Sequence, residues 1–402
     1  MKFKKTIKDI DLQGNILLLR VDYNVPFDSS TGKISDDSRI QATLPTIKYL
    51  LDRNAKIILI SHRGRPRGYD PSLSLKPIAA HLSHILKQPV NLLPKFIIPD
   101  IKHEANKMAQ SSILMLENIR FHSGEENNDA DFAKSLSSLG EYYVNDAFGV
   151  SHRSHASITG IPQLIPGFAG LLLEKELISL GKVLNQPEQP LTVIMGGSKV
   201  SDKMAVMENL LPLSQNIIVG GGMAAEFIAN TGYSVGSSKL EEGGIDLANK
   251  ITELASKTNT EILLPSDVVV ASEINKYVKG KIVDINSVPE NMMILDIGPK
   301  SIGAFGDTIS KSKTILWNGP MGVFEIAEFS KGTQKIANLV GAQTSRGSTT
   351  LLGGGSTAEA AQFFDINEQV THVSTGGGAS LTFLEGKELP GLKYLIPKIN
   401  HP

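Results

Sequence analysis

Short apolar runs rich in Ile, Leu and Val recur along the chain, and each is followed by a longer stretch with helical spacing. This alternation is typical of βαβ units, so it predicts an α/β fold built on parallel sheets. The expected strands of the first half are Ile16–Val21, Lys56–Ser61, Ile113–Leu116 and Glu141–Val144. Those of the second half are Leu191–Met195, Asn216–Val219, Glu261–Leu264, Met293–Leu295, Thr314–Trp317 and Thr349–Leu352.

The length of 402 residues is enough for two or three domains. Between the two sets of strands lies a segment, 161–190, in which prolines bracket a helical stretch at Leu171–Leu184. We therefore expect two doubly wound parallel-sheet domains, 1–170 and 186–388, joined by a connecting helix and hinge at 171–185. The last residues, 389–402, hold three prolines and no regular period, which indicates a tail packed over a surface.

Composition excludes several classes of site. The chain has 40 Lys and Arg against 41 Asp and Glu, so nucleic-acid binding would need a strongly segregated basic face. It has no Cys, which removes disulfides, thiolate zinc sites and Cys nucleophiles. The first apolar run is cut by Arg20, and no window approaches the length of a membrane span. We expect a cytoplasmic protein that binds neither nucleic acid nor membrane.

Basic residues follow the expected strands of the first half. They stand in the segments 20–24, 61–66, 117–121 and 145–155, and Arg39 lies in a loop-like stretch between the first two. A single Arg beside a strand is usually a solvated side chain or an ion-pair partner. Ligands of open parallel sheets bind outside the carboxyl ends of the strands, so four basic strand ends indicate one pocket for a small, multiply charged anion.

Glycine clusters follow the expected strands of the second half, at 196–197, 220–222, 318–320, 353–357 and 374–378. One cluster alone could simply form a tight turn between a strand and a helix. Five clusters, one of them beside Lys199 and Lys203, favour a nucleotide, because glycine lets the backbone approach a phosphate and the next helix offers free N–H groups.

Other chemistries have weaker support. No P-loop motif occurs, whereas Gly220-x-Gly222-x-x-Ala225 matches the loose dinucleotide fingerprint and keeps a nicotinamide-dependent dehydrogenase open. A two-domain solute receptor would also close on an anion. His81 and His84 are better explained as a pair on a helix surface than as metal ligands, and no arrangement typical of a hydrolase is present.

Seven segments resemble the phosphoglycerate kinase family, in order and over essentially the whole chain. They are Arg-Val-Asp-Tyr-Asn-Val-Pro (20–26), Ser-His-Arg-Gly-Arg-Pro (61–66), Leu-Glu-Asn-Ile-Arg-Phe (116–121), Asn-Asp-Ala-Phe-Gly (145–149), Gly-Gly-Ser-Lys-Val-Ser-Asp-Lys (196–203), Trp-Asn-Gly-Pro-Met-Gly-Val-Phe-Glu (317–325) and Ser-Thr-Gly-Gly-Gly-Ala-Ser (374–380). The resemblance implies reversible transfer of a phosphoryl group from 1,3-bisphosphoglycerate to ADP, giving 3-phosphoglycerate and ATP, with Mg²⁺. It also implies two domains that face each other across a cleft, and a tail from Leu389 that returns to the first.

The resemblance also implies residue roles. The phosphoglycerate set is Asp22, Asn24, Arg39, His62, Arg65, Arg120 and Arg153, in which the arginines and His62 form the basic patch. The nucleotide set is Gly197, Lys203, Gly221, Gly222, Asn318, Pro320, Val323, Glu325, Gly353, Gly354, Gly355 and Ser356, with Glu325 on the ribose. The catalytic set is Arg39, Lys199 and Gly355.

One position departs from the family pattern. Ser356 stands where the family usually has an aspartate that binds magnesium, so the metal ligands of this chain are unknown. Ser356-Thr-Ala-Glu359 reads as a capping box, which would make the serine the cap of the next helix.

The reaction type explains the lack of an acid–base pair. The acceptor in the direction that consumes ATP is a carboxylate, which is already ionised at pH 7. Positioning and charge stabilisation then carry the rate. Arg39 and Lys199 lie in different expected domains, so we expect the domains to close about the segment 161–190. We also expect a monomer.

Overall fold

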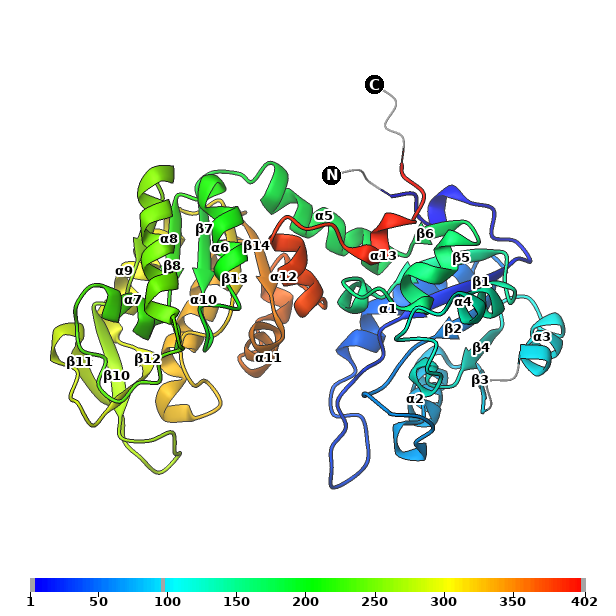
Figure 1. Ribbon diagram of the computed structural model, residues 1–402, viewed down its shortest axis with the longest axis horizontal. Helices are drawn as coiled ribbons and strands as arrows, with labels where there is room; N and C mark the ends of the chain where they lie inside the picture. The colour runs from blue at the N-terminus through cyan, green and yellow to red at the C-terminus, as the bar shows by residue number, and fades with distance from the viewer. Residues whose placement is uncertain (1–3, 95–97, 399–402) are drawn as a thin grey trace. The chain divides into compact units, whose positions relative to one another are not determined.

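The computed structural model describes residues 4–94 and 98–398. The chain divides into two compact units, Met1–Ile178 with Glu388–Pro402, and Ser179–Lys387. The division falls inside helix α5 (Leu171–Asn185), which begins at the residue that the sequence predicts. The expected α/β class with two parallel-sheet domains is confirmed. Figure 1 gives the labels of the elements.

The first unit is built on a six-stranded parallel sheet in the order β3-β4-β2-β1-β5-β6. Its strands are β1 (Ile16–Val21), β2 (Lys56–Ile60), β3 (Val90–Leu93), β4 (Ile113–Leu116), β5 (Tyr142–Asp146) and β6 (Gly167–Ala169). The sequence predicts β1, β2, β4 and β5 to within two residues at each end and misses β3 and β6. Both missed strands are short and lie at the edges of the sheet. Edge strands are less completely buried, so their sequences show a weaker apolar pattern.

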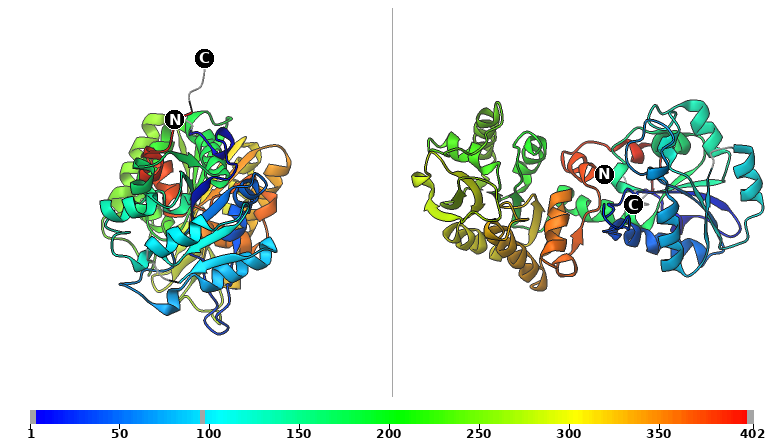
Figure 2. Two further views of the ribbon diagram at one scale, coloured as in Figure 1. Left: turned by 90° about the vertical axis from the view of Figure 1, so that its right-hand side faces the viewer. Right: turned by 90° about the horizontal axis from the view of Figure 1, so that it is seen from below.

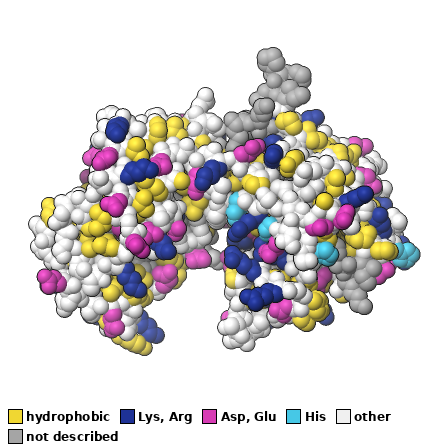
Figure 3. All heavy atoms as spheres, in the orientation of Figure 1, with side chains coloured by type: hydrophobic (Ala, Val, Ile, Leu, Met, Phe, Trp, Pro, Cys, Tyr) yellow, Lys and Arg dark blue, Asp and Glu magenta, His cyan; other side chains and the backbone are white. Residues whose placement is uncertain are grey.

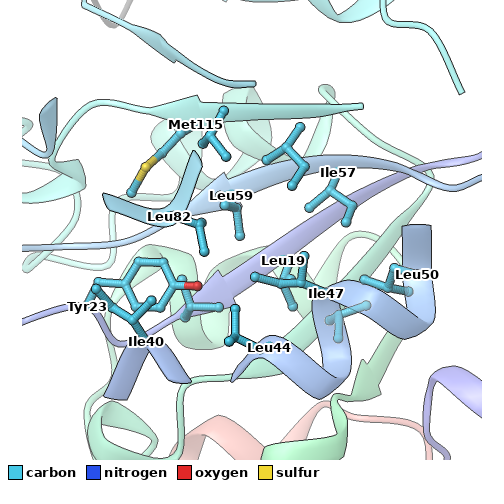
Figure 4. Close-up of a cluster of buried hydrophobic side chains, with 14 of the residues drawn as sticks. Leu19, Tyr23, Ile40, Leu44, Ile47, Leu50, Ile57, Leu59, Leu82 and Met115 are labelled. Carbon is cyan, nitrogen blue, oxygen red and sulfur yellow. The ribbon is translucent and has the colours of Figure 1, made fainter. Parts of the chain in front are cut away.

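The helices of this unit are α1 (Ser38–Leu51), α2 (Lys76–Leu86), α3 (Ile98–Asn106), α4 (Ala130–Ser137) and α13 (Pro390–Lys393), with the start of α5. One face of the sheet packs against α1 and α2, where Leu19 and Ile57 share a buried cluster with Ile47 (Figure 4). Leu18 and Ile58, whose side chains alternate to the opposite face, are fully buried too. Both faces are therefore covered, as a doubly wound sheet requires.

The C-terminal segment packs on the first unit. The Ile396 amide donates to the Gly167 carbonyl at 2.9 Å, and the Lys5 amide donates to Ile396 at 2.8 Å. Asn145, at the end of β5, donates through Nδ2 to the Gly391 carbonyl at 3.1 Å. Figures 1 and 2 show this red segment beside the unit that carries the blue and cyan first part of the chain. The last residues of the expected tail, 399–402, lie outside the described residues.

The second unit has a six-stranded parallel sheet in the order β15-β14-β13-β7-β8-β9. Its strands are β7 (Leu191–Met195), β8 (Asn216–Val219), β9 (Glu261–Leu263), β13 (Thr314–Asn318), β14 (Thr349–Gly353) and β15 (His372–Val373). Its helices are α6 (Met204–Leu210), α7 (Ala224–Asn230), α8 (Gly244–Thr258), α9 (Pro299–Lys311), α10 (Lys331–Ser345), α11 (Gly355–Phe363) and α12 (Gly378–Leu384). Trp317 and Ile194 are fully buried against Phe305 and Ile336 of α9 and α10.

A second, smaller sheet corrects one expectation. The run at 293–295 belongs to β12 (Met293–Ile297), which pairs antiparallel with β10 (Asp267–Ala271). With β11 (Lys281–Asp284) these strands form a separate sheet rather than extending the parallel one. A short apolar run does not reveal which sheet it joins, because parallel and antiparallel strands bury similar side chains.

Among the residues described, no helix is long and apolar enough to cross a membrane.

Candidate active site

Charged and amide side chains at the carboxyl end of the first sheet are held in fixed positions. Asp22 directly follows β1, and its Oδ2 accepts a hydrogen bond from Arg39 Nη1 at 2.5 Å. Arg39 lies in the first turn of α1, not in a loop as the sequence suggests, because the helix already begins at Ser38. Its side chain is one-third exposed, so the arginine is oriented by Asp22 and still open to a ligand.

Asn24 and Asn118 shape the loop after β2. The Gly64 amide donates to Asn24 Oδ1 at 2.9 Å, and Asn118 Nδ2 donates to the Arg63 carbonyl at 2.8 Å. Arg120 Nη1 donates to the Gly64 carbonyl at 2.7 Å. Gly64 has φ +63°, a left-handed conformation that suits glycine, and here it turns the loop between these partners. The predicted ligand residue Asn24 thus organises the loop that carries the exposed Arg65.

His62 is buried beside Arg20 and near two further arginines. Its Nδ1 lies 3.3 Å from Arg20 Nη2 and 3.8 Å from Asp22 Oδ1. Burial, followed by the charges of Arg20, Arg120 and Arg39, holds the pKa of His62 well below its usual value. The expectation that His62 adds charge to the basic patch is therefore corrected. At neutral pH His62 adds a hydrogen-bonding ring and no positive charge.

Arg20 is absent from the predicted set of site residues although the structure places it in the same cluster. Its side chain is fully buried, and its Nε donates to Ser157 Oγ at 2.8 Å. Glu125, also fully buried, accepts from Ser157 Oγ at 2.6 Å and lies 4.0 Å from Arg20 Nη2. A charged residue inside the apolar run of β1 is the signal that could have identified it, since arginine is rarely buried without a partner.

The loop after β5 completes the basic surface. Arg153 is exposed, and His152 and His155 flank it. Burial and the charge of Arg120 lower the pKa of His155 to about 4, so this ring is also neutral at pH 7. Dark blue and cyan side chains gather on this unit in Figure 3. The structure thus joins Asp22, Arg39, His62 and Arg120 through contacts and nearby charges, and Arg65 and Arg153 lie on the adjoining loops.

The second unit contains a pocket of about 620 Å³ at the carboxyl ends of its strands. Seven residues of the predicted nucleotide set line it: Gly197, Gly221, Gly222, Pro320, Val323, Glu325 and Ser356. Lining residues that the sequence analysis missed are Ser198, Ser238, Lys239, Glu273, Ile274, Met293, Ile294, Leu295, Gly322 and Phe324. Several of these come from the small antiparallel sheet and its flanks, which carry no glycine cluster to mark them.

Two glycines allow the loops of this pocket to touch. A Cβ on Gly221, which has φ +65°, would lie 2.6 Å from the Gly197 nitrogen and 2.7 Å from the Pro320 oxygen. A Cβ on Gly319, at φ +100°, would lie 2.2 Å from the Gly196 oxygen. All three distances are shorter than real Cβ contacts, so only glycine fits at these two positions. The glycine clusters therefore bring three backbone loops together, as well as leaving room for a ligand.

Lys203 and Asn318 lie side by side in the second unit. Lys203 Nζ donates to Asn318 Oδ1, and burial lowers the pKa of the lysine. Asn318 is the last residue of β13, and its Nδ2 is buried without a hydrogen-bond partner among the described residues. Lys199, four residues before Lys203, is exposed.

The cluster at 353–356 forms the start of α11. Gly354 is the N-cap, at φ +92°, and Gly355 is the first helical residue, so free backbone N–H groups face out of this end of the helix. Ser356 is the second residue of α11 and lines the pocket. The predicted capping box is therefore wrong, because the chain turns into the helix at glycine before it reaches the serine.

Metal ligands are sparse. Within 4–94 and 98–398 there is no group of three or more His, Asp or Glu side chains that could hold a metal ion by themselves. His81, on α2, pairs through Nε2 with Asp37 Oδ2 at 2.8 Å, which agrees with a helix-surface role.

Comparisons with known proteins agree with this geometry. The family model described as phosphoglycerate kinase matches residues 7–387. Phosphoglycerate kinase of Dictyoglomus turgidum is 48% identical over 398 residues, covering 98% of this chain and 100% of that protein. That of Thermosipho africanus is 48% identical over 397 residues, with 98% of each chain covered. The structure of phosphoglycerate kinase from Coxiella burnetii superposes with a TM-score of 0.88 at 36% identity, covering 97% of this chain and 98% of that one.

Proposed function

The chain belongs to the phosphoglycerate kinase family and is an enzyme of glycolytic phosphoryl transfer, and we propose that its first unit binds the phosphoglycerate and its second unit the nucleotide. The reaction moves a phosphoryl group reversibly between 1,3-bisphosphoglycerate and ADP, giving 3-phosphoglycerate and ATP. This membership excludes the dehydrogenase and the solute receptor that the sequence left open. The observation that supports the division most strongly is the arginine cluster, which lies wholly in the first unit, whereas the pocket lies wholly in the second.

In the first unit, Arg39, Arg65, Arg120 and Arg153 bind the phosphate and carboxylate of the substrate. Arginine suits both groups because its planar fork donates two parallel hydrogen bonds. Asp22 and Asn24 act by holding Arg39 and the Gly64 turn, and neutral His62 donates or accepts a hydrogen bond.

In the second unit, the apolar side chains of the pocket cover the nucleoside, and Glu325 accepts hydrogen bonds from the ribose. Gly197, Gly221, Gly222, Pro320 and Val323 form its walls. Lys199 and Lys203 contact the phosphates together with Asn318. Backbone N–H groups at 353–355, at the N-terminus of α11, supply further donors for phosphate oxygens.

The chemical step requires charge stabilisation and alignment. The attacking carboxylate needs no general base, so the protein acts on the three equatorial oxygens of the transferring group. Arg39 approaches them from one unit, and Lys199 and the Gly355 N–H from the other. The two units must therefore close on each other about α5, which excludes water from the reacting groups. Small-angle scattering should show a smaller radius of gyration with both substrates than with either one.

Mg²⁺ fits this site as a partner of the nucleotide. Magnesium keeps several waters and is bound largely through substrate phosphates, so a site with few protein ligands is chemically suitable. The Ser356 hydroxyl, which lines the pocket, is the side chain that would contact the ion or its waters. When bound, the ion neutralises charge on the phosphates.

We also propose that the enzyme works as a monomer in the cytoplasm.

A phosphotransfer assay tests the proposed function. Purified protein with 3-phosphoglycerate, ATP and Mg²⁺ should form 1,3-bisphosphoglycerate and ADP, and glycerate and lactate should not replace 3-phosphoglycerate. Turnover with lactate, or none with 3-phosphoglycerate, would contradict the assignment.

A further inference from the structure

One loop carries both lysines that we assign to the nucleotide phosphates, since Lys199 and Lys203 lie between β7 and α6. Inside the loop, the amides of Lys203 and Met204 both donate to the Val200 carbonyl at 2.9 Å. The side chain of Val200 is buried and holds the base of the loop in the core. These contacts set a local turn, but they leave its exposed side, including Lys199 and Ser201, to be fixed from outside the loop.

Glu241 fixes that exposed side. It lies between α7 and α8, 40 residues beyond Ser201 in the sequence. Its Oε2 accepts from the Ser201 backbone amide at 3.1 Å, and its Oε1 accepts from the Ser201 hydroxyl. A carboxylate that binds two donors of one residue sets orientation as well as distance. Ser201 is midway between the two lysines, so this attachment holds the segment that presents both.

Glu241 is itself held by the fold. Its backbone amide donates to Glu226 Oε1 at 3.1 Å, and its carbonyl accepts from the Gly244 amide at 2.9 Å. The Glu226 side chain is fully buried on α7, and burial raises its pKa. A Cβ on Gly244 would lie 2.7 Å from Glu226 Cγ, so this packing is tight. The series of hydrogen bonds from Glu226 to Glu241 to Ser201 thus links the loop to the buried helix α7.

The charge of Glu241 also acts on the loop. Hydrogen bonds from Ser201, and then the positive charge of Lys199, lower the pKa of Glu241, so it is a carboxylate at neutral pH. Two lysines in one short loop repel each other. A carboxylate anchored at Ser201 offsets part of this repulsion without occupying either ammonium group through a direct hydrogen bond.

We propose that Glu241 is a positioning residue for phosphoryl transfer, which acts through Ser201 to hold Lys199 and Lys203 where they meet the nucleotide phosphates. This inference rests on the proposed function. It assigns no contact between Glu241 and either substrate.

The test compares Glu241→Ala, Glu241→Gln, Ser201→Ala and the double variant that combines Glu241→Ala with Ser201→Ala. Glu242→Ala is the matched control because Glu242 is the exposed neighbour. For each, kcat, the KM for MgATP, the KM for 3-phosphoglycerate and the midpoint of thermal unfolding are measured. Glu241→Ala should lower kcat/KM for MgATP about 10- to 100-fold, the size expected of a misplaced catalytic group, and leave the KM for 3-phosphoglycerate unchanged. Glu241→Gln should restore most of the loss, because its amide oxygen can accept from the Ser201 backbone amide while its NH2 group donates to the Ser201 hydroxyl oxygen.

The outcomes separate this inference from the proposed function. Wild-type protein without phosphotransfer would overturn the proposed function itself. Active wild type with Glu241→Ala equal to Glu242→Ala would overturn only the role of Glu241, as would equal losses in the Ala and Gln variants. The double variant should be no worse than Glu241→Ala alone, because both changes break one attachment, whereas additive losses would contradict action through Ser201. If Glu241→Ala does not fold, Ser201→Ala carries the same comparison.

Discussion

The Asp22 carboxylate holds the Arg39 guanidinium at 2.5 Å, so a residue at the end of β1 sets the direction of a side chain in the first turn of α1. This ion pair leaves one-third of the arginine side chain exposed. A cation that is already held in place before the substrate binds needs no reorganisation to stabilise the charge that develops in the transition state. Preorganised groups contribute to catalysis in this way.

Arg39→Ala and Lys199→Ala should each lower kcat by about 10²-fold or more, with smaller effects on KM, because both groups act mainly on charge that develops in the transition state. Steady-state kinetics at saturating substrates measures this. Arg53→Ala, two residues beyond the C-terminal end of α1 and exposed, serves as the control for the arginine. Near wild-type turnover in either active-site variant would remove that residue from the catalytic set.

Arg120→Lys should raise the KM for 3-phosphoglycerate and leave the KM for MgATP almost unchanged. A lysine presents its donors from a single nitrogen, so it cannot reproduce the planar guanidinium fork, in which Nη1 donates to the Gly64 carbonyl and the other nitrogens are separate donors. Arg67→Lys, in the exposed part of the loop after β2 that carries Gly64, is the control. An effect confined to MgATP would place Arg120 in the nucleotide site instead.

We expect two buried carboxyls, Asp146 and Asp296, to differ in how much stability the protein loses when each is replaced by asparagine. Burial raises the pKa of Asp146 and of Asp296 to about 7. Asp146 Oδ1 accepts from both Leu172 and Leu173 at the start of α5. Its Oδ2 makes no hydrogen bond of standard geometry among the described residues, and the nearby Thr46 hydroxyl, which lowers the pKa of Asp146, can also accept from an amide. Asp296 uses both oxygens, with Oδ1 accepting from Ile297 and Oδ2 from Gly332. Asp146→Asn should therefore fold well, and Asp296→Asn should lose a few kcal/mol because its amide must face a backbone donor.

The pH dependence follows from the same shifts. A carboxyl with a folded pKa near 7 and an unfolded pKa near 3.8 binds more protons when folded, so its stability contribution is complete below about pH 4 and is lost as pH rises through 7. Urea unfolding from pH 4.5 to 8 should show a flatter profile for Asp146→Asn than for wild type. Parallel profiles would show that Asp146 does not titrate in this range.

Ser356→Asp should lower the Mg²⁺ concentration needed for half-maximal activity, because a carboxylate adds charge next to the phosphates that hold the ion. A Mg²⁺ titration at fixed nucleotide compares the two proteins, and calorimetry of MgADP binding gives a second readout. Identical curves would show that this position is structural. Full wild-type activity in excess chelator would contradict the phosphoryl-transfer mechanism itself.

The long buried strands were predictable because each carries an apolar run with a clear end. Strand β1 was predicted to the residue, whereas β3 and β6 were missed as short edge strands. The antiparallel sheet was missed because the apolar runs of β10 and β12 do not show by themselves that these two strands pair antiparallel with each other.

The site was predictable where residue type carries the chemistry, as for the arginines and the glycine clusters. It was not predictable where burial decides the role. The neutral state of His62 depends on its buried position beside Arg20, and the pocket wall at Ile274 depends on the small sheet. The helix start at Gly355, one residue before the serine of the expected capping box, depends on the backbone conformation of Gly354.

Binding of one substrate at a time tests the central claim, the division of the substrates between the two units, most directly. Calorimetry would measure 3-phosphoglycerate and MgADP separately on wild type, Arg153→Ala and Lys203→Ala. Arg153→Ala should lose about tenfold or more in affinity for 3-phosphoglycerate and keep its affinity for MgADP, and Lys203→Ala should show the reverse, because each removes a charged contact in one unit only. Loss of both ligands in either folded variant, or the opposite pairing of variant and ligand, would contradict the division.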